Sequence, residues 1–234
     1  LGVFKAMAGR PVTIRTLDPP LHEFLPKREE LMVEIAVMEA TEQTGPELDA
    51  KKALLARVEQ LHEFNPMLGH RGCRLGITFP EIYGMQVRAI LEAAADCIGR
   101  GLDVQPKIMV PQVCTAQELK RVKSYVDAVH EVVESKYGVK VKFKFGSMME
   151  VVRACMRAEN LAEEAEFFSF GTNDLTQATF SFSREDAENK FLPMYNERGI
   201  LQDNPFEVLD VKGVGKLMEL AVGWGRQTRP GLKV

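Results

Sequence analysis

The sequence predicts an α/β fold built on a parallel sheet, which is either an open doubly wound sheet or part of a (β/α)8 barrel. Short runs rich in β-branched residues alternate along the chain with longer stretches of helical periodicity. Strands that alternate with helices in this way form parallel sheets with right-handed crossovers. No GxGxxG motif follows an expected strand and no Walker A loop is present, so no nucleotide site is predicted.

Five strands are expected, and a sixth begins at Leu232. The first has alternating β-branched residues and stops at the turn signal Asp18-Pro19-Pro20. The second is short and follows Asn65-Pro66. The predicted strands occupy residues 11–17, 68–75, 107–113, 140–146 and 166–171.

Helices are expected between the strands because apolar residues recur there at helical spacing. The helix over residues 115–133 opens with a capping box formed by Thr115 and Glu118. The helix over residues 80–98 is expected to bury Ile82, Met85, Ala89 and Ala93. A polar loop is expected over residues 183–204. Further helices are predicted over residues 47–64, 150–158, from about 174, and 213–224.

Composition and charge exclude some classes of partner. The 234 residues carry a formal net charge of -3, and 45% of them are hydrophobic, which allows a sizeable core. This charge balance predicts no nucleic-acid partner and no membrane-surface partner. No apolar run reaches the roughly 18 residues that a membrane span requires.

The four cysteines form no CxxC pair, and we expect them to be reduced core thiols of an intracellular protein. This favours a cytoplasmic location, and organellar targeting stays open because an address could lie outside this sequence. The chain starts at Leu1 without an initiator Met and stops at Val234, where a strand is expected to begin. We therefore expect it to be a piece of a longer polypeptide.

Polar residues suited to a binding site lie at the ends of the expected strands. Arg15, Arg71 and Glu150 each end or follow a separate strand, and Asn173 with Asp174 follows another. In a (β/α)8 barrel the C-terminal strand ends form the rim where active sites lie, so these side chains are expected to meet there. Simpler roles stay open, with Asp174 as the N-cap of the next helix and Asn173 as a turn residue.

These residue types match the needs of a magnesium-dependent anion site. Magnesium takes about six oxygens, of which one or two typically come from protein carboxylates, and Glu150 with Asp174 supplies two. The guanidinium groups of Arg15 and Arg71 suit a planar carboxylate or phosphate. Gly171 would let backbone amides approach a ligand closely.

Four stretches of the chain carry a family resemblance. They are GRPVTIRTLDPPLHEFLP at 9–26, NPMLGHRGCRL at 65–75, FFSFGTNDLTQ at 167–177 and GRQTRPGLK at 225–233. Together they resemble pyruvate, phosphate dikinase, over essentially the whole chain. FGTNDLTQ is shared with the wider phosphoenolpyruvate-utilising group, including phosphoenolpyruvate synthase and sugar phosphotransferase enzyme I, whereas LDPPLHEFLP and NPMLGHRGCRL are more particular to the dikinase.

The resemblance implies an enzyme of three parts that converts ATP, phosphate and pyruvate reversibly into AMP, pyrophosphate and phosphoenolpyruvate. An ATP-grasp domain takes phosphate from ATP, a swivelling domain carries it on a histidine, and a C-terminal (β/α)8 barrel passes it to pyruvate. Residues 1–234 then form part of that barrel domain, about strands 2–6 and the start of strand 7. The family also implies a homodimer assembled through the barrel.

The family pattern assigns Arg15 and Arg71 to the phosphoryl and nearby oxygens of the substrate. It assigns Glu150 and Asp174 to Mg²⁺ as the cofactor. It implies that Gly171, Thr172 and Asn173 contact the substrate, partly through their backbone groups.

Two departures from the family pattern stand out. Val151-Val152 follows Glu150 where the family has Ile-Pro, which alters the helix start and not the metal ligand. The cysteine that protonates the enolate is expected beyond Val234, so no catalytic acid is assigned to any of the four cysteines present.

Three hypotheses remain at this point. The chain is the substrate half-site of a dikinase, in which case it should not turn over by itself. It belongs to a related enzyme, phosphoenolpyruvate synthase or a phosphotransferase enzyme I relative. Alternatively, it is a non-catalytic dimerisation or binding module that kept the shape of the barrel.

Overall fold

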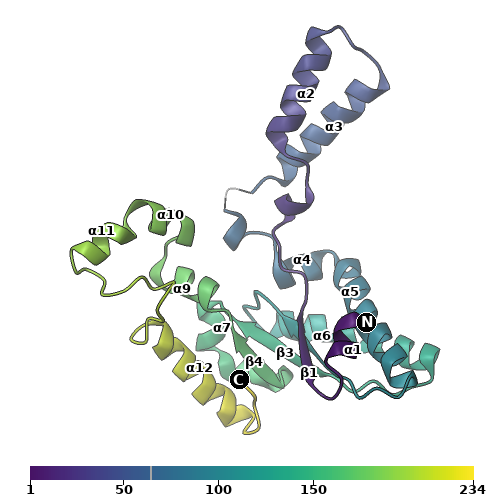
Figure 1. Cartoon of the computed structure of the whole chain (residues 1–234), viewed down its shortest axis with the longest axis vertical. Helices are drawn as coiled ribbons and strands as arrows, with labels where there is room; N and C mark the ends of the chain where they lie inside the picture. Colours follow the sequence, from purple (N-terminus) through teal and green to yellow (C-terminus); the bar gives the residue numbers. More distant parts are fainter. Residues whose placement is uncertain (64) are drawn as a thin grey trace. The chain divides into compact units, whose positions relative to one another are not determined.

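The sheet has four parallel strands, hydrogen-bonded in the order β1-β2-β3-β4. Figure 1 labels β1, β3 and β4 of this sheet. The structure is a computed structural model that describes residues 1–63 and 65–234. Each strand is followed along the chain by helices, and the arrangement is compatible with part of an α/β barrel. The strands are β1 (Pro11–Arg15), β2 (Gln105–Val110), β3 (Lys144–Met149) and β4 (Phe167–Phe170).

The chain divides into two compact units, Leu1–Asp18 with Gly72–Val234, and Pro19–Arg71. The first unit contains the sheet. Its helices are α1 (Gly2–Ala6), α4 (Gly72–Thr78), α5 (Pro80–Gly99), α6 (Ala116–Tyr137), α7 (Val152–Met156), α8 (Ala158–Glu164), α9 (Thr172–Phe180), α10 (Arg184–Lys190), α11 (Leu192–Glu197) and α12 (Val214–Thr228). The prediction of a single domain over residues 1–234 stays a prediction.

Three of the five predicted strands are confirmed with small changes in their limits, namely β1, β2 and β4. The strand predicted over residues 140–146 begins later, at Lys144, and runs to Met149. The reason is that Val141 is tied to the end of α6: its backbone N–H donates to Glu134 Oε1 at 2.8 Å. The shift brings the strand end directly to Glu150.

The strand predicted over residues 68–75 is wrong. The segment instead forms the 3-10 helix Pro66–Leu68 and enters α4 at Gly72. The side chain of Asn65 accepts a hydrogen bond from the backbone N–H of Leu68, which closes a local turn. Local capping of this kind favours a helical turn over a strand at the start of the segment.

The chain end after α12 meets the sheet edge where a sixth strand was expected to begin. A single parallel bridge joins Phe167 to Lys233, and Phe168 N–H donates to the Lys233 carbonyl at 2.8 Å. Leu232 is 2% exposed and packs close to Gly225 of α12. The position of these strands within a complete barrel remains a prediction.

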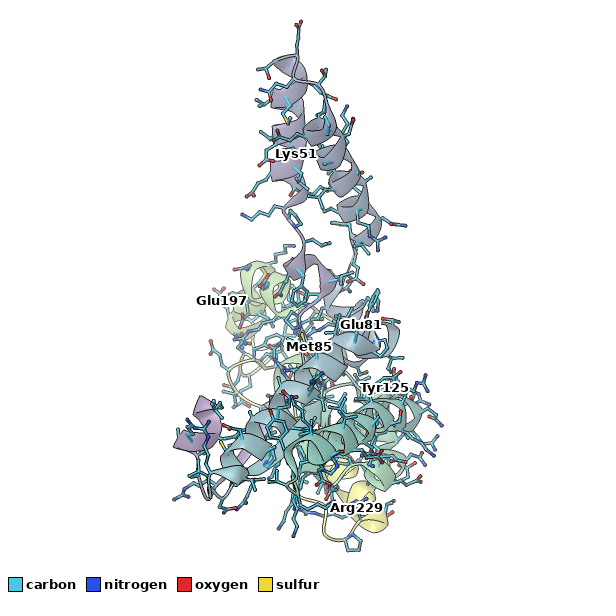
Figure 2. The ribbon with its side chains drawn as sticks, turned by 90° about the vertical axis from the view of Figure 1, so that its right-hand side faces the viewer. Lys51, Glu81, Met85, Tyr125, Glu197 and Arg229 are labelled. Carbon is cyan, nitrogen blue, oxygen red and sulfur yellow. The ribbon has the colours of Figure 1, made fainter. Side chains whose placement is uncertain are left out.

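Helices α5 and α6 pack against each other and contribute many residues to the core. The capping box at the start of α6 is confirmed, with Thr115 and Glu118 each bonding the other's backbone. The predicted apolar face of α5 is displaced, because Met85 is 65% exposed (Figure 2). The face that α5 buries contains Tyr83, Val87, Ile90, Leu91, Ala94, Ala95 and Cys97.

Other predicted elements are recovered in part. The helix expected over 150–158 divides at Arg157 into α7 and α8. The loop expected over 183–204 contains α10 and α11. In the part of the chain that the structure describes, no helix combines the length and apolar character needed to cross a membrane.

The second unit is a pair of helices, α2 (Arg28–Ala40) and α3 (Pro46–Leu61), with the 3-10 helices η1 (Leu21–Phe24) and η2 (Pro66–Leu68). The helix predicted over residues 47–64 is confirmed as α3, and Phe64 lies outside the described residues. No amphipathic pattern indicates α2, because its apolar residues do not share one face: Leu31 and Ile35 are buried, but Val33 and Val37 are exposed.

Candidate functional site

The first element of the site is the end of β1. Arg15 is the last residue of β1, and its Nη1 lies 3.3 Å from Oδ2 of Asp18. The Asp18 side chain is 4% exposed and that of Arg15 is 47% exposed. One end of this ion pair is therefore fixed in the protein, while the guanidinium remains accessible to a ligand. The same Nη1 lies 3.9 Å from Sδ of Met148.

Helix α5 holds the backbone on which Arg15 sits. Gln86 Oε1 accepts a hydrogen bond from Leu17 N–H at 2.7 Å, and Gln86 Nε2 donates to the Arg15 carbonyl at 3.3 Å. The hydroxyl of Tyr83 donates to the Leu17 carbonyl at 3.0 Å. The pairing of β1 with β2 ends where Thr16 N–H donates to the Met109 carbonyl at 2.9 Å, and the bonds from α5 hold the backbone beyond that point.

Glu150 follows β3 directly and is 2% exposed. Its Oε1 accepts the backbone N–H of Gln112 at 2.7 Å. Burial, reinforced by the negative charges of Asp174 and Asp18 and a hydrogen bond to Asp174, raises the pKa of Glu150 to about 7, although the Gln112 N–H acts in the opposite direction. A buried carboxyl group among other carboxylates is a natural place for a cation.

Asp174 lies in the first turn of α9, whose N-cap is Gly171. The rival interpretation of Asp174 as the helix N-cap is therefore wrong. Its Oδ2 accepts a hydrogen bond from Gln112 Nε2 at 2.9 Å, and Asn173 Nδ2 lies 3.4 Å from its Oδ1. The carboxylate near the helix N-terminus is thus positioned beside Glu150, with which it interacts electrostatically.

Gly171 has a role that the sequence did not suggest, while its predicted contact with a ligand stays a prediction. A β-carbon at this position would collide with Glu150 Oε2 and would lie 3.0 Å from both Glu150 Cβ and Met148 Sδ. The absence of a side chain therefore makes room for the carboxylate of Glu150. Thr172 and Asn173, which follow it, are exposed at the start of α9 and can be reached by a ligand.

Arg71 belongs to the second unit, where its Nη1 lies 3.5 Å from the carbonyl oxygen of Met67. The structure thus brings together Arg15, Glu150 and the segment 171–174, and the membership of Arg71 in the same site stays a prediction.

Sequence reasoning missed two further polar residues of this region. Gln112 follows β2 and is 4% exposed, and it donates to both Glu150 and Asp174. Because β2 ends at Val110, earlier than predicted, Gln112 lay inside the strand predicted over residues 107–113 and not at its end. Arg184 begins α10, and its Nη1 lies 3.4 Å from Asn173 Oδ1. No strand ends near Arg184, so the strand-end rule could not find it.

The face of the sheet that carries the Arg15 side chain is hollowed and has several cationic groups. The hollow, of about 400 Å³, is lined among others by Arg15, Lys107, Met148 and Lys233. Lys107 Nζ lies 5.6 Å from the ring centroid of Phe167, which also lines it. The positive charge of this face would attract an anionic ligand.

The donor set around Glu150 and Asp174 fits magnesium. Among residues 1–63 and 65–234, no cluster of three or more His, Cys, Asp or Glu side chains is arranged to hold a metal. A structural zinc site needs four such ligands, whereas magnesium binds through one or two carboxylates plus water and substrate oxygens. Glu150 and Asp174 are the residues that would hold it.

Comparison with known proteins identifies the family. The family model described as PEP-utilising enzyme, PEP-binding domain, matches residues 1–229. The chain belongs to this family. The chain is also similar to pyruvate, phosphate dikinases over 99–100% of its length. It is 56% identical to one of Entamoeba histolytica, 54% identical to a chloroplastic one of Mesembryanthemum crystallinum, and 52% identical to one of Clostridium symbiosum.

The chain spans about a quarter of the length of these relatives: 26%, 24% and 26%, respectively. The family resemblance predicted from the sequence is thereby confirmed. In this member of the PEP-utilising enzyme family, the buried Glu150, the half-buried Asp174 and the exposed Arg15 follow or end three strands of one parallel sheet.

Proposed function

We propose that this chain is the part of a pyruvate, phosphate dikinase that binds pyruvate and phosphoenolpyruvate with Mg²⁺. The observation that carries the proposal is the convergence of Glu150 and Asp174, from the ends of β3 and β4, beside Arg15 at the end of β1. The identity to dikinases at 51–56% selects this enzyme within the family.

In the proposed site the protein orients an anionic substrate around the metal position. Arg15, and Arg71 with it, would hold the phosphoryl and neighbouring oxygens by forked hydrogen bonds. Thr172 and Asn173 would contact the substrate from the exposed start of α9. Bound Mg²⁺ would stabilise negative charge that develops on the enolate oxygen. No residue of this chain is assigned as the proton donor.

The rest of the proposed enzyme lies in other segments. The phosphoryl group would come from a phosphohistidine on another domain of the same polypeptide, and the enzyme would act as a homodimer in the cytoplasm. By themselves, residues 1–234 are then expected to bind ligand and to show no turnover of ATP, phosphate and pyruvate.

Calorimetric titration of the full chain with oxalate tests the proposed site. Oxalate is a planar dianion with the geometry of the enolate, and we expect it to bind only when Mg²⁺ is present, because the acidic pair would otherwise repel it. Phosphoenolpyruvate should behave in the same way. Binding that is equal with magnesium and with EDTA, or absent in both, would contradict the proposal and favour a non-catalytic module.

In the longer enzyme, Arg71→Ala is expected to reduce phosphorylation of pyruvate by about 100-fold, because an arginine bonded to a charged group contributes up to about 3 kcal/mol. Labelling of the carrier histidine by radioactive ATP should persist, since that step occurs elsewhere. Arg57→Ala is the matched control: Arg57 lies on α3 and bonds Gln60. Unchanged pyruvate phosphorylation in Arg71→Ala would remove Arg71 from the site.

A further inference from the structure

Gln112 connects the two carboxylates that the proposed function assigns to the metal. Its backbone N–H donates to Glu150 Oε1 at 2.7 Å, and its side-chain Nε2 donates to Asp174 Oδ2 at 2.9 Å. One residue at the end of β2 thus bonds one oxygen of each carboxylate at the ends of β3 and β4. The proposed mechanism assigns no role to these two hydrogen bonds of Gln112.

The backbone of Gln112 is held in an unusual conformation. Its φ is 60°, in the left-handed region that residues other than glycine rarely adopt, and the residue is 4% exposed. Cys73 Sγ lies 3.3 Å from the Gln112 carbonyl oxygen, within hydrogen-bonding reach. A β-carbon at Gly72 would lie only 2.8 Å from Cβ and Cγ of Gln112, so Gly72 makes the space that this side chain occupies.

Such strain persists only where the surroundings fix the residue, and it is commonly found at functional sites. Here the strained backbone aims its N–H at Glu150 while the side chain reaches Asp174. An extended backbone at position 112 would change the angle between the N–H and the side chain, so that the residue could not reach Glu150 and Asp174 at once. The strain therefore has an identifiable result, which is the orientation of two carboxylates at once.

We propose that Gln112 is a positioning residue that sets the cation preference of the site for magnesium over calcium; the inference rests on the proposed function. Because Gln112 engages Oε1 of Glu150 and Oδ2 of Asp174, a cation would bind the other oxygens, Glu150 Oε2 and Asp174 Oδ1, and would displace the 3.4 Å contact of Asp174 Oδ1 with Asn173 Nδ2. The protein then contributes one oxygen from each carboxylate, and water and substrate contribute the other ligands of the cation.

A site that offers one oxygen from each carboxylate favours magnesium over calcium. Magnesium requires an octahedron with short distances and accepts a few single carboxylate oxygens together with water. Calcium takes six to eight oxygens at longer distances and gains from carboxylates that bind through both oxygens. Rotation of Asp174 to offer both oxygens would break its bond to Gln112 Nε2, so the amide disfavours calcium.

The test is a competition between Mn²⁺, as a paramagnetic stand-in for magnesium, and Ca²⁺ on the full chain with saturating oxalate. Bound Mn²⁺ is counted by electron paramagnetic resonance, which does not depend on turnover. Gln112→Leu removes the side-chain donor. Gln105→Leu is the matched control, because the side chain of Gln105 donates to Asp103 at the exposed start of β2. Gln112→Asn is a second variant that suits the left-handed backbone but is too short to reach Asp174.

We expect Gln112→Leu and Gln112→Asn to lower the ratio of the Ca²⁺ to the Mn²⁺ dissociation constant by about tenfold, the usual effect of one hydrogen bond to a charged group. Gln105→Leu should leave the ratio unchanged. A wild-type ratio retained in a folded Gln112→Asn variant overturns the role of Gln112 and leaves the proposed function intact. Absence of Mn²⁺ binding in the wild type overturns the proposed function itself.

Discussion

Replacing Gly171 with alanine is expected to weaken magnesium-dependent oxalate binding by about 100-fold, the upper range for changes that misplace a metal ligand. The added methyl group would collide with Glu150 Oε2 and press on Glu150 Cβ and Met148 Sδ at 3.0 Å. Because Glu150 is 2% exposed and its Oε1 accepts the Gln112 N–H, its carboxylate cannot shift without weakening that bond. Isothermal titration of oxalate at saturating magnesium measures the effect.

Gly223→Ala provides the matched control. Gly223 lies in the interior of α12, and no heavy atom comes within 4 Å of a β-carbon placed there. This variant should bind oxalate normally and gain about 0.5–1 kcal/mol of stability from the better helix former. Gly171→Ala should lose about 1–3 kcal/mol through overpacking. Normal oxalate affinity in Gly171→Ala would show that Glu150 is not a ligand.

Glu150→Gln is expected to stabilise the metal-free protein at pH 8 and to abolish its stabilisation by magnesium with oxalate. Burial first, and then the charges of Asp174 and Asp18, raises the pKa of Glu150 from 4.5 to about 7 in the folded state. A raised pKa means that the stability contributed by this group is complete below pH 4.5 and is lost as the pH rises to about 7. The glutamine variant stays neutral and keeps an oxygen that can accept the Gln112 N–H.

The difference between Glu150→Gln and wild type should therefore grow between pH 4.5 and 7, and reach on the order of 3 kcal/mol at pH 8. Urea unfolding in EDTA across this pH range measures it. Glu92→Gln is a control with the opposite sign, because Lys136 and Arg88 hold the pKa of Glu92 below its usual range. A wild type that gains stability relative to Glu150→Gln as the pH rises would contradict the assignment.

Elements with strong local signals were predictable from the sequence. The capping box of Thr115 and Glu118 lies within one turn, and the alternation in β1 needs no distant partner. The misassigned segment 68–75 had apolar residues but a decisive local cap at Asn65. The start of β3 depended on Glu134, which holds Val141 away from the sheet. Tertiary contacts of this kind leave no trace in a short window of sequence.

In the candidate site, too, residues with a local signal were predictable from the sequence and residues that depend on tertiary contacts were not. Arg15, Glu150 and Asp174 were found because charged residues at strand ends are a general mark of barrel sites. Gln112 and Arg184 were missed because their importance lies in contacts to residues on other elements, at Glu150, Asp174 and Asn173. The reason for glycine at 171 was also inaccessible, since the side chain it accommodates lies on another strand.

The second unit, Pro19–Arg71, is an insertion between Asp18 and Gly72 of the first unit, and this has a consequence for how the region changes over evolution. Asp18 and Gly72 are the last and first residues of the first unit on either side of Pro19–Arg71, and a β-carbon on Gly72 would lie 3.1 Å from Asp18 Oδ1. The two attachment points are thus neighbours. An excursion whose ends meet can lengthen or shorten at little entropic cost, so insertions and deletions should accumulate between them while the spacing of β1 and α4 stays constant.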